Sequence, residues 1–273
     1  MYQQDEQMNT WKKAVKEYYR FHKMGRNDFT YRKYFDPILE DKDINTISKQ
    51  DIAKIKSGIK GKPSTVNRYL SYFRAILMYA YEELGWLDSK PIIKRVKEQP
   101  MKTKYFTLEQ IKRLYKVLPD HLKDPFEFSL LTGVRMSNCL NLKWTHIHKN
   151  QIAIDATETK NGRPLCVPLN KRCLELLQSI NNTSPYVFTY AGRKINRASN
   201  TGWYNALKKA GLEGFRWHDI RHTWASYHVQ NGTPLYTLQH LGGWSNPNIV
   251  NRYAHLSEDH LSEACENVNT LLS

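Results

Sequence analysis

The sequence predicts a mainly α-helical protein with one small antiparallel β-sheet, divided between two domains. Three observations lead to this fold class. Apolar residues recur with helical spacing over most of the chain, the period becomes strand-like between residues 151 and 169, and a polar, basic segment separates two helical regions near residue 100. We expect a helical domain at 1–96, a basic linker at 97–104 and a larger domain with the sheet at 105–273.

The charge balance favours a polyanionic partner. Hydrophobic residues make up 40% of the 273 residues and charged residues 25%, which is typical of a folded protein rather than a disordered one. Against 26 Asp and Glu stand 41 Lys and Arg, a net charge of +15. The excess is spread evenly, because residues 1–100 carry 20 basic and 13 acidic residues (+7) and residues 101–273 carry 21 and 13 (+8). Such a distribution suits nucleic-acid binding, although solubility alone would also explain it.

The cysteines and the N-terminus indicate a cytoplasmic protein. No CxxC pair is present among the four cysteines, which predicts reduced thiols rather than disulfides or a zinc site: Cys139, Cys166, Cys173 and Cys265. The first ten residues are polar, and no apolar run approaches the roughly 18 residues of a membrane span. We therefore expect a soluble protein without a membrane partner.

The clearest helix of the first domain is expected after Lys62-Pro63, with Ser64 or Thr65 as its N-cap and Gly85 at its C-terminal end. Its apolar face has alternating spacings of three and four residues: Val66, Leu70, Phe73, Leu77, Ala80 and Leu84. Arg68 and Arg74 lie off this face, where each could contact either DNA phosphates or water.

The second domain should begin with a helix that Thr107 and Gln110 cap, since they have capping-box spacing. We expect the buried face of this helix to consist of Leu108, Ile111, Leu114, Tyr115 and Leu118. A helix at about 125–131, a break at Thr132-Gly133 and a helix through Leu142 should follow.

Two strands are expected next, from the alternation of Ile152 and Ile154 and then of Leu165, Val167 and Leu169. Asn161-Gly162 lies between them and is typical of a type I′ hairpin turn. From Leu174 onward the helical pattern resumes.

Four short segments carry residues that could cleave a DNA phosphodiester without a metal ion. This chemistry needs a nucleophile, cationic groups that stabilise the phosphorane, and an acid for the leaving oxygen. In the first segment, Arg135 follows the break at Thr132-Gly133 and can bind two phosphate oxygens. In the second, Lys160 adjoins the expected turn. Either residue taken alone is more often an ordinary surface residue.

In the third segment, His218, Arg221 and His222 share one helix face because they are spaced i, i+3 and i+4. Two histidines four apart also resemble half of a zinc site, but Asp219 stands where a metalloprotease has glutamate, and the arginine between the histidines would repel Zn²⁺. The fourth segment carries Tyr253 after a short helix.

That short helix should be capped by Asn246 and opened by Pro247. Together, the strings TGVR with LKW, TKNGRPLCVPL, HDIRHTWAS and LGGW…RYAHL resemble the tyrosine recombinases of the phage integrase type over essentially the whole chain. The resemblance implies a helical core-binding domain and a mixed α/β catalytic domain that close around DNA.

The resemblance also assigns catalytic roles. Arg135 and Arg221 would bind the non-bridging oxygens of the scissile phosphate, and Lys160 would protonate the leaving 5′ oxygen. His218 would accept the proton of Tyr253, which attacks to form a 3′-phosphotyrosyl bond. Because this bond conserves the energy of the phosphodiester, the resemblance implies neither ATP, nor a metal ion, nor another cofactor.

Three further positions complete the expected site. Trp244 stands where the family has histidine or tryptophan, and its indole N–H can donate to a phosphate oxygen but cannot relay a proton. His222 is interpreted as a supporting residue. Asn138 stands where many members have an acidic residue, and we expect it to orient Arg135 through an uncharged hydrogen bond.

The resemblance further implies a homotetramer on two DNA duplexes, with accessory DNA-bending proteins as possible partners. The tail from Ser257 to Ser273 has apolar residues in roughly helical register, so it either docks on a neighbouring protomer or packs on its own domain: Leu261, Ala264, Val268, Leu271 and Leu272.

Three other functions compete with recombination. A type IB topoisomerase would use similar chemistry as a monomer, although the TGVR and LGGW strings favour a recombinase. A catalytically inactive DNA-binding repressor would not need all six catalytic positions to be filled. A hydrolytic nuclease would need clustered carboxylates for metal ions, and these are sparse around the four segments.

Overall fold

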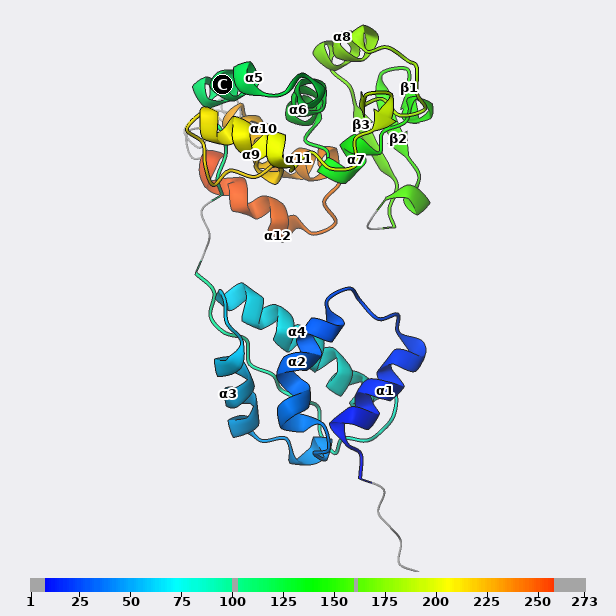
Figure 1. Cartoon of the computed structure of the whole chain (residues 1–273), viewed down its shortest axis with the longest axis vertical. Helices are drawn as coiled ribbons and strands as arrows, with labels where there is room; N and C mark the ends of the chain where they lie inside the picture. The colour runs from blue at the N-terminus through cyan, green and yellow to red at the C-terminus, as the bar shows by residue number, and fades with distance from the viewer. Residues whose placement is uncertain (1–7, 100–102, 160–161, 258–273) are drawn as a thin grey trace, which may run out of the picture. The chain divides into compact units, whose positions relative to one another are not determined.

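The computed structural model describes residues 8–99, 103–159 and 162–257, and it confirms a mainly helical fold with small antiparallel sheets (Figure 1). The chain divides into two compact units, Met1–Met101 and Lys102–Ser273. Each unit has a hydrophobic core of its own. None of the described helices is long and apolar enough to cross a membrane.

The first unit is helical and packs around aromatic side chains. Its elements are α1 (Trp11–Phe21), α2 (Asp28–Leu39), η1 (Ile44–Thr46), α3 (Lys49–Gly58) and α4 (Pro63–Glu82). Trp11, Phe35 and Phe73 are fully buried and contact one another with ring centroids 5.1 to 5.9 Å apart. Because each ring comes from a different helix, this cluster holds α1, α2 and α4 together.

Helix α4 confirms the apolar face expected from the sequence, since all but one of its positions are buried: Val66, Leu70, Phe73, Leu77 and Ala80. Leu84 lies beyond the helix end and is half-buried. The expected cap at Ser64 or Thr65 is wrong, because Pro63 begins the helix and Lys62, two residues before Ser64, is the N-cap. Arg68 and Arg74 lie on the exposed side.

The segment after α4 is fastened to the first unit by Asn67, whose side chain is 1% exposed. The Asn67 amide donates to the Val96 carbonyl and to Glu98, and it accepts the Val96 N–H at 2.7 Å. In the second unit, the Phe106 N–H donates to Thr223 Oγ1 at 2.9 Å. Residues 99–105 therefore lie between the two anchors.

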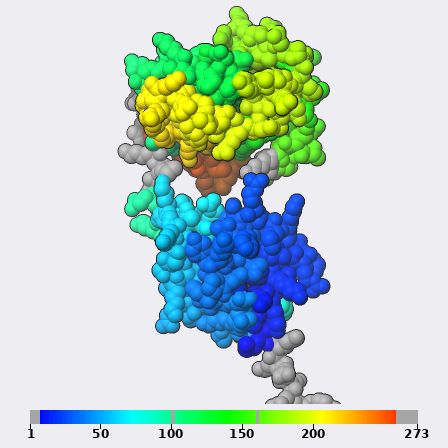
Figure 2. Space-filling model, in the orientation of Figure 1, coloured from blue at the N-terminus to red at the C-terminus, as the bar shows by residue number. Residues whose placement is uncertain are grey.

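The second unit consists of short helices around small sheets. Its helices are α5 (Leu108–Val117), α6 (Asp120–Thr132), α7 (Met136–Leu140), α8 (Lys171–Ser179), α9 (Thr201–Lys209), α10 (His218–Gln230), α11 (Leu235–Leu241) and α12 (Pro247–Val250). The 3-10 turns are η2 (Trp144–His146), η3 (Ala156–Glu158) and η4 (Asn251–Ser257). In the space-filling view the yellow surface of α9 borders the green surface of α5, against which it packs (Figure 2).

Strands β1 (Ile147–His148), β2 (Gln151–Ile154) and β3 (Leu165–Pro168) form the expected antiparallel sheet in the order β1-β2-β3. A second sheet of β4 (Thr189–Tyr190) and β5 (Arg193–Lys194) was not predicted, because each strand has only two residues and no alternation to detect.

The hairpin between β2 and β3 is confirmed, but the tight turn expected at Asn161-Gly162 is wrong. The strands pair up to Ile154 and Leu165, so residues 155–164 connect them. Within this connection lies η3, and Thr159 Oγ1 bonds both to the N–H and to the carbonyl of Arg163. Asn161 lies outside the described residues.

Helix α5 has the expected capping box, in which Thr107 and Gln110 bond each other's backbone N–H. Leu114 and Leu118 are buried as expected, but Leu108 is 60% exposed, so its expected burial is wrong. Helix α6 begins at Asp120, earlier than expected, and contains Pro125.

Candidate active site

Six of the residues singled out by the sequence lie on or beside α10, which packs against α6, α11 and η4: Arg135, His218, Arg221, His222, Trp244 and Tyr253. Arg221 lies at the centre of this site and is 4% exposed. Its guanidinium donates to the Gly133 carbonyl at 2.6 Å and to the Gly242 carbonyl at 2.5 Å. The ring of Trp244 lies 4.1 Å from the guanidinium carbon, so a stacking contact adds to the two hydrogen bonds.

Both of these carbonyls belong to glycines at positions where the neighbouring tryptophan rings leave no space for a side chain. A Cβ on Gly133 would lie 2.2 Å from the Trp224 ring, and one on Gly242 would lie 2.2 Å from Trp244. Gly133 also has a φ of 63°, the left-handed conformation that ends α6. The glycines of TGVR and LGGW therefore let two loops approach tryptophan rings closely enough to hold Arg221 between their carbonyls.

Replacing Gly133 by alanine should destabilise the second unit more than the same change at Gly211. Both glycines have φ near 60°, so each substitution carries the left-handed strain of about 1 kcal/mol. Gly211 faces open space, whereas Gly133 meets Trp224, so overpacking should cost Gly133→Ala about 1–3 kcal/mol more. Denaturant unfolding of the two variants measures this difference, and equal losses would contradict the packing argument.

The site concentrates positive charge without a balancing carboxylate. Burial and the nearby Arg135 guanidinium lower the pKa of Arg221 to about 9. Among the described residues, neither arginine forms an ion pair, and the buried Asp219 is paired with Arg216 at 2.7 Å. The expected hydrogen bond from Asn138 to Arg135 is not formed between these two described residues. An anion that entered the site would therefore find unused charge.

Tyr253 lies beside this cluster on η4 and is 1% exposed. Its hydroxyl is 2.6 Å from Nδ1 of His222. Burial raises the pKa of Tyr253 to about 12, although Arg252 and Arg221 oppose the shift. Burial and the neighbouring His218 lower the pKa of His222 to about 4, so its imidazole is neutral at pH 7.

The two histidines of the HDIRH string thus differ in position. His218 is exposed at the start of α10, its ring 5.0 Å from that of His222, and no hydrogen bond joins it to Tyr253. Partial desolvation by the surrounding protein and then the Arg221 guanidinium lower the pKa of His218. The structure therefore brings His222, interpreted from the sequence only as a supporting residue, to the phenol.

Trp244 is 8% exposed, and its ring lies 6.2 Å from that of Tyr253. The Trp244 ring is therefore next to both the Arg221 guanidinium and the Tyr253 ring. No hydrogen bond joins its indole N–H to another described residue, which leaves this donor available.

Lys160 lies outside the described residues, but the segment before it is well anchored. Glu158 accepts hydrogen bonds from Lys143 and bonds Nε2 of His146 at 2.8 Å. The Lys143 bond, with help from His146, lowers the pKa of Glu158. Sequence reasoning missed this network, since Lys143 and His146 lie at η2 and Glu158 on the distant η3, and such a pairing gives no spacing signal; only the LKW string pointed to the region.

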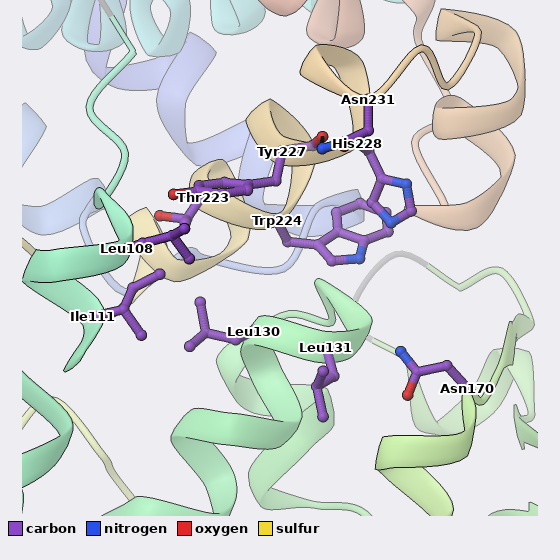
Figure 3. Close-up of a pocket in the computed structure, with 10 residues that line it drawn as sticks. All are labelled: Leu108, Ile111, Leu130, Leu131, Asn170, Thr223, Trp224, Tyr227, His228 and Asn231. Carbon is purple, nitrogen blue, oxygen red and sulfur yellow. Dashed lines mark hydrogen bonds between the residues drawn. The ribbon is translucent and has the colours of Figure 1, made fainter.

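A separate apolar groove of about 470 Å³ lies on another side of α10. Figure 3 shows Trp224 and Tyr227 of α10 facing Leu130 and Leu131 of α6 across it. Leu108 also lines this groove, which accounts for its exposure.

Comparison with known proteins agrees with this geometry. The model of the phage integrase family matches residues 104–260, more than half of the chain. The integrase of Salmonella phage P22 is 37% identical over 231 residues, which are 78% of this chain and 60% of that integrase. The integrase of Escherichia phage 186 is 25% identical and covers 96% of this chain and 82% of its own length. The chain thus spans less than two thirds of the P22 relative.

The fold also matches solved structures. A lambda integrase (75–356) dimer bound to a COC′ core site has a TM-score of 0.74 at 18% identity, covering 89% of this chain and 95% of that one. A lambda integrase tetramer bound to a Holliday junction has a TM-score of 0.71 at 17% identity, covering 91% and 78%. The two-part architecture expected from the sequence is therefore that of these integrases.

Proposed function

The chain belongs to the phage integrase family, and we propose that it is a site-specific DNA recombinase of the integrase or excisionase type that works through a 3′-phosphotyrosyl intermediate. One observation carries the proposal furthest. Arg221 and Arg135 provide positive charge that no described carboxylate balances, and the Tyr253 hydroxyl lies in the same site. This combination suits a phosphodiester as the missing anion.

The proposed reaction begins when Arg135 and Arg221 bind the two non-bridging oxygens of the scissile phosphate. Tyr253 Oη attacks phosphorus, the P–O5′ bond breaks, and Lys160 donates a proton to the leaving 5′ oxygen. Reversal of these steps with a 5′ hydroxyl from the partner duplex joins the new strand. Neither ATP nor a metal ion is needed, because the phosphotyrosyl bond conserves the energy of the original linkage.

The Trp244 indole N–H and the exposed His218 ring would add contacts to the phosphate. The resemblance assigns the proton of Tyr253 to His218, which is close to the site but is not bonded to the hydroxyl. Arg68 and Arg74, exposed on α4, are candidates for contacts with the DNA backbone. Their charge would contribute to affinity rather than to sequence recognition.

We propose double-stranded DNA as the partner and a homotetramer on two duplexes as the active assembly, with accessory DNA-bending proteins as possible helpers, in the cytoplasm. The related lambda integrase was solved as a dimer on a core site and as a tetramer on a Holliday junction. The tail at 257–273 would link neighbouring copies, and the apolar groove beside α10 is a surface of suitable chemistry for it. Light scattering of the DNA complex with and without residues 258–273 tests this, since an unchanged tetramer without the tail would contradict it.

The function can be tested with nicked duplexes that carry candidate sites. After cleavage next to the nick, the short flanking strand diffuses away, so the covalent complex accumulates. We expect a band resistant to denaturation in the presence of a chelator, and recombination between two intact copies of the same site. Relaxation of supercoils without recombination would instead support a topoisomerase, and no band on a DNA that the protein binds would contradict the proposal.

A further inference from the structure

The contact between His222 and Tyr253 is the shortest route for a proton out of the proposed nucleophile. Nδ1 of His222 lies 2.6 Å from Tyr253 Oη, and both side chains are buried, at 9% and 1% exposure. His222 comes from α10 and Tyr253 from η4, two elements that pack directly on each other. The contact is thus fixed by the packing of the second unit.

The protonation states leave the phenol able to donate and the imidazole able to accept. The pKa of Tyr253 is raised to about 12 by burial, so the phenol keeps its proton at pH 7. The pKa of His222 is lowered to about 4 by burial and then by His218, so its ring is neutral. A neutral imidazole carries its proton on one ring nitrogen and can accept through the other. In the tautomer that leaves Nδ1 unprotonated, the phenol donates to His222, and His222 is poised to take the proton of Tyr253.

No other described side chain competes for this role. His218 is not hydrogen-bonded to Tyr253, and its ring meets His222 edge to face at 5.0 Å. Arg221 uses its guanidinium on the Gly133 and Gly242 carbonyls. The contact with Nδ1 of His222 is thus the one described hydrogen bond of the Tyr253 hydroxyl.

We propose that His222 is the general base that takes the proton of Tyr253 as Oη attacks the scissile phosphorus, and the acid that returns it on rejoining. This inference rests on the proposed function. In cleavage, the Oη–P bond forms, the Oη–H proton passes to Nδ1, and the P–O5′ bond breaks with a proton from Lys160. In rejoining, the 5′ hydroxyl attacks phosphorus and returns its proton to Lys160, while the Oη–P bond breaks and the His222 imidazolium protonates the departing Oη.

The surroundings make His222 a better base when DNA is bound. The charged or titratable groups facing it are His218 and Asp219 on its own helix, Arg252 on η4, and Arg216 before the helix. All but Asp219 lower its pKa. A phosphate between Arg135 and Arg221 brings negative charge into this cationic surrounding, which raises the pKa of His222 toward the working pH.

The test is single-turnover formation of the covalent complex by His222→Asn. The asparagine amide occupies the place of Nδ1 and can still hold the phenol, but it cannot accept the proton. We expect cleavage about 100-fold slower, the usual size of a general-base effect. His148→Asn is the control for the same substitution, because His148 is exposed on β1 and lies in neither the site nor the groove. It should cleave like the wild type.

A substrate with sulfur in place of the bridging 5′ oxygen separates the two proton transfers, because a thiolate leaves without an acid. On this substrate Lys160→Ala should recover, whereas His222→Asn should remain slow. Cleavage by His222→Asn within about threefold of the wild type, or its recovery on the sulfur substrate, would overturn the inference while leaving the proposed function intact. No covalent complex with the wild-type protein on either substrate would defeat both.

One measurement on the wild-type protein remains decisive if His222→Asn does not fold. The ¹⁵N chemical shift of His222 Nδ1 distinguishes an unprotonated nitrogen from an N–H. An unprotonated Nδ1 at pH 7 is expected, and an Nδ1–H that donates to the phenol would overturn the assignment of His222 as the base.

Discussion

Replacing Tyr253 by phenylalanine is expected to abolish the covalent protein–DNA complex while the fold and DNA binding persist. The change removes one oxygen, and with it the only atom that can form the phosphotyrosyl bond in the proposed reaction. The structural cost is the hydrogen bond to Nδ1 of His222, about 1 kcal/mol. Denaturing gels of the nicked-substrate reaction, together with thermal unfolding and a binding assay, measure all three properties.

Tyr236→Phe is the control for this experiment. Tyr236 lies on α11 and is 73% exposed, so its hydroxyl should contribute neither to the fold nor to cleavage. A covalent band that persists in Tyr253→Phe but disappears in another tyrosine variant would show that this other tyrosine is the nucleophile.

Arg221→Lys should produce the second largest effect, a loss of about 100- to 1000-fold in the rate of cleavage. Lysine keeps the charge, but it lacks the planar fork that lets Arg221 bond the Gly133 and Gly242 carbonyls while it stacks on Trp244. The phosphate would therefore meet a mobile ammonium in place of a fixed guanidinium. Single-turnover cleavage at saturating protein measures the loss.

Arg172→Lys is the control for Arg221→Lys, because it makes the same substitution outside the active site. Arg172 is 62% exposed and pairs with Glu127 at the surface, where such pairs contribute little. It should cleave at the wild-type rate. If Arg221→Lys were equally active, a role for the fixed geometry of Arg221 in transition-state stabilisation would be excluded.

Local patterns explain why much of the fold could be predicted from the sequence. The buried face of α4 follows directly from apolar spacing, and the capping box of α5 from Thr107 and Gln110. Both features depend on residues a few positions apart. The turn at Asn161-Gly162 was wrong because the local signal competes with η3 and the Glu158 network, whose partners lie on a distant turn.

In the active site, too, sequence patterns predicted which residues are involved but not which of them contact one another. The TGVR and LGGW motifs could be recognised in the sequence. The reason that they contain glycine, the close approach of Gly133 to Trp224 and of Gly242 to Trp244, is visible only in the tertiary structure. Helical spacing placed His218 and His222 on one face without saying which of them meets Tyr253. The packing of η4 on α10 decides this, and no spacing along the chain reports it.

The proposed 3′-phosphotyrosyl intermediate is tested by identifying the residue to which the DNA is joined. The complex trapped on a nicked duplex in the presence of a chelator would be digested with nuclease and protease, and the nucleotide-bearing peptide sequenced by mass spectrometry. We expect a 3′-phosphate linked to Tyr253. Linkage to any other residue, or a 5′-phosphate linkage, would contradict the proposal.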